Sequence, residues 1–257
     1  MMLQNTEEEF EIHERWFTLK DQEIVEPAQR SPEWFALRKG KLSGSKLSQF
    51  LFIKSHEDRV KFYEEVFEGR KRDPFTAEQQ SWMSWGTKHE DTAMRILLTN
   101  VQNMYAMEAP MVQHSSIQWL ASSPDGFYEF FDDSGAVYEQ GVVEIKCPAK
   151  TKKATKKPTY YYIMQTYLEM ACSGRDKVIF CSWGKDKCRA WRMTWDDELW
   201  GVLSTLIHDF RVTKTDKALS FDDWKLLQYR LLEACHRICD EATPLHEGDG
   251  WDSEYVE

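Results

Sequence analysis

The sequence lacks the features that mark disulfide-rich, membrane-spanning or secreted proteins. Its 257 residues include only 6 cysteines, too few for a disulfide scaffold, so we expect reduced thiols. No apolar run approaches the roughly 20 residues that a membrane-spanning helix needs. The acidic start, "MMLQNTEEEF", has no signal-peptide pattern. We therefore expect a cytoplasmic protein that is not secreted and does not contact a membrane.

Glycine and proline are also scarce, with 12 and 8 residues, and no linker or internal repeat interrupts the chain. A hydrophobic share of 42% is enough for one substantial core. We expect a single domain over residues 31–240, preceded by an N-terminal extension over 1–30. Residues 241–257 are acidic and poor in apolar side chains, which is typical of a mobile tail.

An excess of positive charge is absent as well, because the formal net charge is −10. This excludes a surface coated with positive charge for general nucleic-acid binding, but it does not exclude a local basic cleft. Six lysines crowd one short segment: Lys146, Lys150, Lys152, Lys153, Lys156 and Lys157. These lysines could contact phosphate groups, or they could belong to a solvated loop.

Periodicity and capping residues predict an α/β or α+β fold with a central mixed sheet flanked by helices. Ser31 and Pro32 begin a first helix, which Gly40 ends, and a short helix follows near 43–45. Further helices are predicted over about 56–69, 82–100, 159–172, 196–212 and 219–240. Strands are predicted at about 109–114, 117–121, 126–130, 142–147, 177–183 and 188–195, the last two as a hairpin.

The segment "SSPDGFYEFFDDSGAVYEQGVVEIKCPAK", residues 122–150, contains two acids and a lysine in a suggestive arrangement. Side chains alternate along a strand, so Glu144 and Lys146 share one face. Asp125 lies at the turn into the preceding strand, where it could reach the same end of the sheet. Two carboxylates and a backbone carbonyl suit Mg²⁺ better than zinc. The alternative for a Glu-x-Lys pair alone is an exposed cross-strand salt bridge.

These residues resemble the PD-(D/E)xK nucleases, which share a restriction-endonuclease-like core, and in particular the YqaJ or bacteriophage lambda exonuclease branch of viral recombination nucleases. "SSPDG" followed by "VEIKCP" is similar to the core motif of that group. The resemblance continues, in the same order along the chain, in "EWFALRKGKLSGS", "SWGTKHE" and "IMQTYLEM". It spans about residues 31–195, and the two last helices would be C-terminal additions to the core.

The resemblance implies a role for each matching residue of the core. Asp125 and Glu144 would be metal ligands, with the backbone carbonyl of Ile145 beside them. Lys146 would be the catalytic lysine. An ammonium next to a metal can orient or deprotonate the attacking water and offset charge on a phosphorane-like transition state.

Two further residues correspond to functional positions. Glu90 would support the metal site; it lies on the apolar stripe of its helix, where an unpaired carboxylate is costly to bury. The alternative is a buried acid paired with a structural Arg or Lys. Gln165 shares a helix face with Tyr161, Tyr162 and Leu168 and should point inward, where the family places a Gln that bonds the catalytic lysine or the substrate. A core amide bonded to backbone is the alternative.

Arg38, Ser45 and Ser43 resemble the family's pocket for a 5′-terminal phosphate. An Arg fork plus a hydroxyl beside a helix N-terminus makes an anion site, although Arg38 could equally be an ordinary surface cation. Three lysines of the lysine-rich segment would add contacts to the DNA backbone: Lys150, Lys152 and Lys153.

By resemblance, the activity is a Mg²⁺-dependent 5′-to-3′ exonuclease acting on the ends of linear double-stranded DNA, with Mn²⁺ as a substitute ion. Its 3′ overhangs would feed a single-strand annealing protein, in the host cytoplasm if the protein is viral. The active form would be a homotrimer. Two alternatives are a related endonuclease of restriction or RecB-like type and a non-catalytic DNA-binding protein on the same fold.

Cys235, His236 and Cys239 in "ACHRIC" invite a metal interpretation as well. A tetrahedral zinc site usually needs four ligands, and no second pair of ligands lies nearby in the sequence. Iron–sulfur clusters of some RecB-like nucleases use one cysteine before the catalytic core and three after it. Here the first cysteine is Cys147, inside the core, so that pattern is absent.

Overall fold

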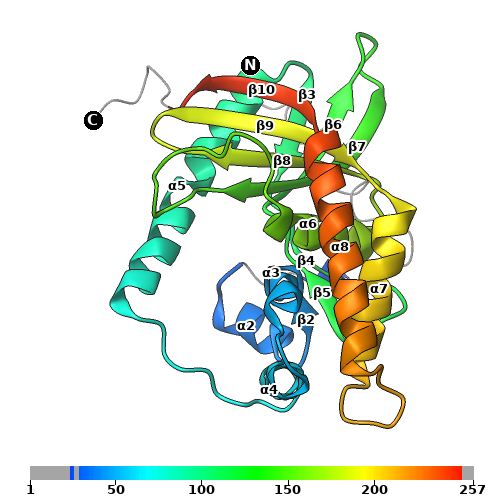
Figure 1. Cartoon of the computed structure of the whole chain (residues 1–257). Helices are drawn as coiled ribbons and strands as arrows, with labels where there is room; N and C mark the ends of the chain where they lie inside the picture. Colours follow the sequence, from blue (N-terminus) through cyan, green and yellow to red (C-terminus); the bar gives the residue numbers. More distant parts are fainter. Residues whose placement is uncertain (1–23, 26–28, 251–257) are drawn as a thin grey trace.

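The computed structural model describes residues 24–25 and 29–250, which form two β-sheets and the helices around them (Figure 1). The larger sheet has six strands in the order β10-β9-β8-β7-β6-β3, and the smaller has four in the order β1-β4-β5-β2. The predicted α/β class with a central mixed sheet is confirmed, and the second sheet is an addition that was not predicted. The predicted extension over 1–30 lies outside the described residues, apart from 24–25 and 29–30.

The larger sheet is mixed because β7 and β8 run parallel while the other neighbouring strands run antiparallel. The predicted hairpin of β8 and β9 is present. The strands are β3 (Met104–Met107), β6 (Gly126–Phe131), β7 (Val137–Lys146), β8 (Lys177–Trp183), β9 (Lys187–Thr194) and β10 (Thr243–Asp249). The strands of the smaller sheet are β1 (Ile24–Val25), β2 (Leu42–Ser43), β4 (Met111–Gln113) and β5 (Leu120–Ser122).

The helices begin where the sequence offers a cap. The Ser31 hydroxyl accepts a hydrogen bond from the Trp34 amide at 3.1 Å and starts α2, as predicted. Thr76 and Gln79 form a capping box that starts α5 five residues before the predicted position. The helices are α2 (Pro32–Arg38), α3 (Gly44–Leu47), the 3₁₀ helix η1 (Ser48–Phe52), α4 (His56–Phe67), α5 (Ala77–Asn100), α6 (Tyr160–Ser173), α7 (Asp197–Arg211) and α8 (Phe221–Glu241).

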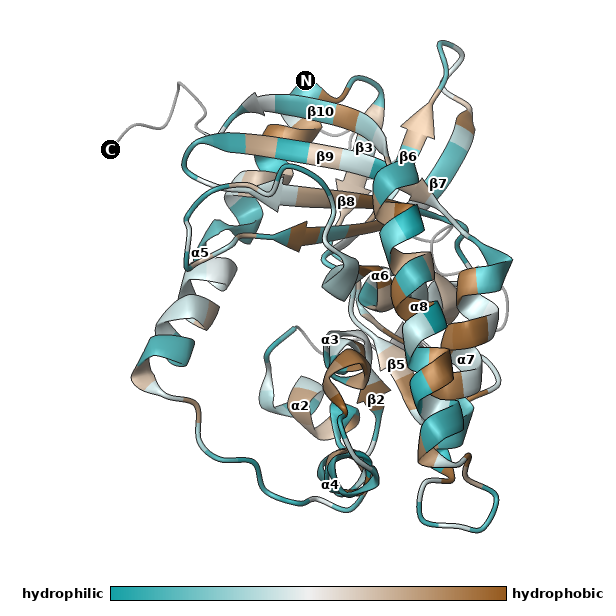
Figure 2. Ribbon diagram, viewed as in Figure 1, coloured by the Kyte–Doolittle hydropathy of each residue, from teal (hydrophilic) through white to brown (hydrophobic). Residues whose placement is uncertain are grey.

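Helices cover both faces of the larger sheet, and each face has its own hydrophobic core. Val143 and Ile145 of β7 pack with Leu97 of α5 on one face. Val142 of β7 packs with Leu168 of α6 on the other. Figure 2 shows hydrophobic residues along β8 at the centre of the sheet and mostly hydrophilic residues in β10 at its edge. None of the helices in the described ranges combines the length and the apolar character that crossing a membrane requires.

Strand β10 corrects the prediction of a mobile acidic tail. Six of its seven residues pair with β9 in antiparallel register, with a shift in register between Pro244 and His246, so the prediction is wrong for Thr243–Asp249. Arg189 of β9 forms an ion pair with Glu247 at 3.2 Å, and Lys187 forms one with Asp249 at 3.1 Å. The acids of the tail therefore complement cations of the neighbouring strand. Residues 251–257 lie outside the described part of the chain.

Candidate active site

Strand β7 places Glu144 and Lys146 on the face of the sheet that α6 covers. Val142 belongs to the core on this face, and the predicted alternation puts Glu144 and Lys146 on the same side, away from Val143 and Ile145. Glu144 is 1% exposed, and the Lys146 Nζ donates a hydrogen bond to its Oε1. An ion pair therefore projects toward α6 from the C-terminal half of β7, whose other residues are apolar.

Asp125 lies between β5 and β6 and reaches the same end of β7. Its Oδ2 accepts a hydrogen bond from the Ile145 amide at 2.6 Å, because Gly126 pairs with Val143 and carries the preceding residue alongside the strand. Burial, and after it the charge of Glu144, raise the pKa of Asp125 well above its usual range. The structure thus brings the two predicted carboxylates together.

A cavity of about 270 Å³ opens beside Asp125 and Ile145. Glu90 of α5 lines it, as does Arg30, whose guanidinium lies 2.5 Å from the Glu90 carboxylate. Glu90 therefore lines the same cavity as Asp125 while it is paired with an arginine. The remaining lining residues are Gln29, Asp91, Met94, Ala106, Met107 and Glu108.

Gln165 points inward from α6, as predicted, but its hydrogen bonds differ from those that the resemblance implied. Its Nε2 donates to Glu144 Oε1, and also to Glu169 Oε1 at 2.8 Å, so it contacts a predicted metal ligand and not Lys146. Glu169 is 1% exposed, and burial together with the charge of Glu144 raises its pKa well above its usual range. Glu169 was missed in the sequence; a Glu four residues after Gln165 on an apolar helix was the available signal.

Lys146 is held by the carboxylates around it. Burial lowers the pKa of its ammonium, but the charges of Glu144 and Asp125 and the hydrogen bond to Glu144 outweigh burial and raise it overall. The Nζ also lies 5.2 Å from the centre of the Tyr162 ring, within cation–π distance. Lys146 therefore keeps its proton in this arrangement.

The donor set fits a hard divalent cation. Glu144 Oε2 is buried and has no hydrogen-bond partner in the described part of the chain, which is costly unless a cation satisfies it. Asp125 and Ile145 line the cavity. Among the described residues no three His, Cys, Asp or Glu side chains form a ready-made metal cluster. Two carboxylates with a backbone carbonyl leave positions for water and substrate, as Mg²⁺ prefers.

Arg38 forms the second part of the site. One guanidinium nitrogen donates to Ser45 Oγ at 3.3 Å and another to Ser123 Oγ at 3.2 Å, while the ring of Trp34 lies 4.1 Å from the guanidinium carbon. The buried Ser43 hydroxyl lies 3.5 Å from that of Ser45. Arg38 forms no ion pair within the described residues. Burial lowers its pKa to about 10, and the charge of Glu169 opposes this only in part.

Ser123 joins the two parts of the site and was missed in the sequence. It accepts hydrogen bonds from Arg38 and from Trp34 Nε1, at 3.2 Å each, and stands two residues before Asp125. The available signal was its place directly before the Pro-Asp pair. Gly44 lets this region pack on α6, since an added Cβ would lie 2.9 Å from the Gln165 side chain.

The predicted DNA-binding lysines lie in the loop between β7 and α6. Lys150, Lys152 and Lys153 are exposed, and the Lys152 ammonium lies 4.9 Å from the centre of the Trp85 ring on α5. The loop therefore reaches toward α5 and does not enter the carboxylate cluster. Cys235 and Cys239 are buried on α8, while the His236 ring packs on Tyr160 at 4.7 Å.

Comparison with known proteins identifies the family and supports the fold. A family model described as a YqaJ-like viral recombinase domain matches residues 33–176. The alkaline exonuclease LHK-Exo from Laribacter hongkongensis superposes with a TM-score of 0.51 at 23% identity, over 80% of this chain and 99% of that one. Its complex with dAMP gives a TM-score of 0.50 at 23% identity and the same coverage. A sequence search of curated proteins found no match.

Proposed function

Because the chain belongs to the YqaJ-like viral recombinase family, as its motifs suggested, we propose that it is a Mg²⁺-dependent exonuclease that digests one strand of linear duplex DNA from the 5′ end. The observation that carries the proposal is the direct connection between the two parts of the site. Ser123 bonds the half-buried Arg38, and Asp125 follows two residues later beside Glu144. A phosphate group held at Arg38 would keep the adjacent phosphodiester close to the carboxylates.

In this proposal Asp125, Glu144 and the Ile145 carbonyl hold the Mg²⁺ ion. When bound, such an ion lowers the pKa of a coordinated water and offsets negative charge on the phosphate under attack. Glu144 Oε2, the buried oxygen without a partner in the described residues, supplies the strongest reason for placing a cation here. Mn²⁺ should substitute, because it accepts the same oxygen ligands.

Three side chains of the protein would position the reacting groups. Lys146 keeps its proton next to Glu144 and supplies a positive charge toward the phosphate that develops negative charge. Gln165 uses its two amide hydrogens on Glu144 and Glu169, and so fixes the Glu144 side chain. Glu90 lines the same cavity as Asp125 and would hold water molecules there.

The 5′ polarity rests on Arg38, Ser45, Ser43 and Ser123. A guanidinium surrounded by hydroxyls, with no ion pair among the described residues, suits a terminal phosphate with its two negative charges. The related exonuclease from Laribacter hongkongensis was solved with dAMP, a nucleotide that carries one phosphate group. Lys150, Lys152 and Lys153 would contact the backbone of the duplex.

The proposal extends to partners through the family. A 3′ single strand left by digestion would be handed to a single-strand annealing protein, and a homotrimer would surround the DNA. Both are analogies with the family, because fold likeness alone does not transfer assembly or partners.

The test is digestion of linear and of covalently closed circular duplex with Mg²⁺, using linear substrates labelled at the 5′ or at the 3′ end. The expected result is degradation of linear DNA alone, with early release of the 5′ label as a mononucleotide and retention of the 3′ label. Cleavage of the closed circle would favour the endonuclease alternative. Absence of cleavage with Mg²⁺ and with Mn²⁺, together with DNA binding, would favour a non-catalytic DNA-binding protein.

A further inference from the structure

A row of aromatic rings lies beside the candidate active site and is not explained by the proposed chemistry. Phe52 of η1 stacks on Tyr161 of α6 with ring centres 6.1 Å apart and planes 24° apart. Tyr160 lies 4.0 Å from Tyr161, and His236 of α8 lies 4.7 Å from Tyr160. Three elements that are distant in the sequence therefore contribute rings to one continuous row.

The outer pair of this row is open to solvent. Phe52 is 57% exposed and Tyr161 is 38% exposed, although the sequence pattern placed Tyr161 on the inward face of its helix with Gln165. That prediction is wrong for Tyr161. These rings expose apolar surface to water, so a ligand that covers them would bind favourably.

The row lies next in the sequence to a residue that contacts the candidate active site. Tyr162, the neighbour of Tyr161, lies under the ammonium of the catalytic lysine candidate, Lys146, at 5.2 Å. Exposed lysines flank the row in the sequence, with Lys54 two residues after Phe52 and Lys156 five residues before Tyr161. Neither lysine forms an ion pair within the described residues. Exposed rings accompanied by unpaired cations are what single-stranded nucleic acids bind, with bases on the rings and phosphates on the cations.

We propose that Phe52, Tyr161 and Tyr160 form a stacking site for bases of the single strand that digestion leaves behind. This rests on the proposed nuclease function and adds a site that the catalytic residues and the 5′-phosphate pocket do not include. Duplex DNA keeps its bases stacked inside the helix, so the site selects single-stranded DNA. Stacking tolerates any base, as a nuclease that acts along a long duplex requires.

The experiment measures binding of a fluorescent single-stranded oligonucleotide by anisotropy, with Ca²⁺ in place of Mg²⁺ so that the DNA stays intact. Phe52→Ala and Tyr161→Ala should each weaken binding about tenfold, whereas Tyr161→Trp should retain it. Affinity for a blunt duplex should change less than about twofold. Tyr138→Ala is the matched control: this tyrosine is 62% exposed and stacks on Phe130 at 6.0 Å, at the far end of β7 from Glu144 and Lys146.

An oligonucleotide with a run of abasic sites tests stacking without altering the protein. Wild type should bind it at least as weakly as Tyr161→Ala binds the normal oligonucleotide. Tyr161→Ala should lose less affinity than wild type when the bases are removed, because only Phe52 and Tyr160 remain to stack on them. Equal affinity of wild type for both oligonucleotides would overturn the proposal, as would a loss of duplex affinity as large as the loss for single strands. A change in the molecular mass of Phe52→Ala in solution would assign the rings to an interface between copies and would also overturn it.

The same protein preparations are assayed on linear duplex with Mg²⁺, so that failure of one proposal can be distinguished from failure of the other. Digestion by wild type combined with unaltered single-strand binding by the variants would remove the stacking site alone. Absence of digestion by wild type would remove the nuclease proposal, whatever the oligonucleotide measurements give.

Discussion

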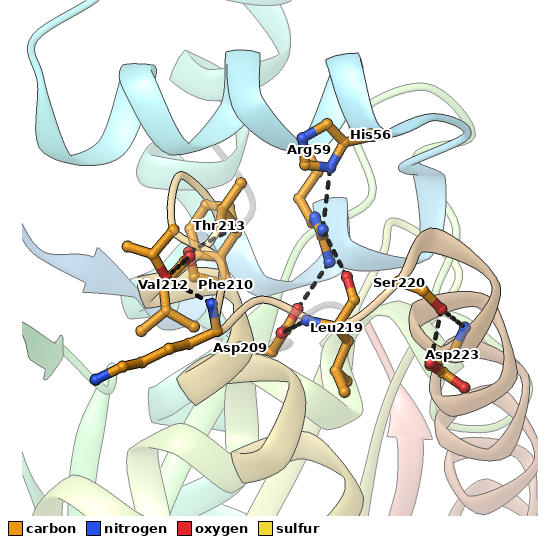
Figure 3. A network of polar contacts seen from close by, with 11 residues as sticks. His56, Arg59, Asp209, Phe210, Val212, Thr213, Leu219, Ser220 and Asp223 are labelled. Carbon is orange, nitrogen blue, oxygen red and sulfur yellow. Dashed lines mark hydrogen bonds and ion pairs between the residues drawn. The ribbon is translucent and has the colours of Figure 1, made fainter.

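Two of the buried clusters of charged side chains in the described part of the chain differ in how completely the charges are matched. In the first, shown in Figure 3, the carboxylate of Asp209 accepts from Arg59 at 2.8 Å and from the Leu219 amide at 2.5 Å. Arg59 also contacts His56 and the Leu219 carbonyl, at 3.0 and 3.1 Å. One cation and one anion tie α4 to the end of α7 and the turn before α8.

The second cluster contains more carboxylates than cations. Asp125, Glu144 and Glu169 surround one ammonium, that of Lys146. Glu144 and Glu169 each keep a buried oxygen without a hydrogen-bond partner in the described part of the chain. A matched pair holds the fold together, whereas an unmatched excess of negative charge costs stability and is retained at sites that bind cations.

The largest effect should follow from removing a carboxylate of the unmatched cluster. Asp125→Ala and Glu144→Ala should each lower cleavage of linear duplex by about a thousandfold or more, because the metal would lose a ligand. Lys146→Ala should act similarly, since it removes the charge that faces the phosphate. Initial rates with Mg²⁺ measure this, and DNA binding with Ca²⁺ should persist. Activity of Asp125→Ala above a few per cent of wild type would contradict the assignment.

Arg59 should matter for the stability of the fold and not for the cleavage rate. Arg59→Met leaves Asp209 buried without its partner and should destabilise the protein by about 3 to 5 kcal/mol in urea unfolding, while the cleavage rate per folded molecule stays near wild type. The double variant Arg59→Met/Asp209→Leu should recover much of the loss, because no uncompensated charge remains. A single variant as stable as wild type would show that the matched pair does not hold α4 in place.

The same contrast explains what the sequence could predict. Alternation along one strand placed Glu144 and Lys146 on a shared face, and the turn before β6 brought Asp125 to them, so local rules were enough. Arg59 and Asp209 are 150 residues apart, and no local pattern connects them. The sequence therefore predicted the unmatched cluster better than the matched one.

Long-range contacts also account for the errors. The tail looked mobile because its acids were judged alone, but Arg189 and Lys187 of β9 supply the opposite charges. Tyr161 looked buried because it shares a helical period with inward residues, yet it lies in the first turn of α6, where Phe52 is the neighbour. In each case the partner comes from an element distant in the sequence.

Arg38 provides an intermediate case, a half-buried cation that has only hydroxyl partners in the described residues. If a 5′-phosphate supplies the missing negative charge, wild type should digest 5′-phosphorylated ends faster than 5′-hydroxyl ends. Arg38→Ala should remove most of that preference, about tenfold to a hundredfold, since a desolvated charge-assisted contact is worth about 1.5 to 3 kcal/mol. Relative rates on the two substrates measure it. Lys41→Ala is the control, because Lys41 is a half-buried lysine that donates to Gln113 Oε1 and to the Gln118 carbonyl. An unchanged preference in Arg38→Ala would separate Arg38 from end recognition.

The last difference concerns the pH dependence of stability without metal. The pKa of Glu169 is raised above its ordinary value of 4.5, so the unfolded chain loses this proton first as the pH rises. Wild type should therefore lose stability relative to Glu169→Gln as the pH rises above 4.5, by about 1.4 kcal/mol per pH unit until the folded pKa is passed.

Glu64 is the control of opposite sign: hydrogen bonds from Lys214 and Arg70 lower its pKa, so its contribution to stability is lost as the pH falls below 4.5. Urea unfolding from pH 3 to pH 8 measures both differences. If the stability of wild type and of Glu169→Gln depended on pH in the same way, folding would not raise the pKa of Glu169. The two clusters would then differ in geometry alone.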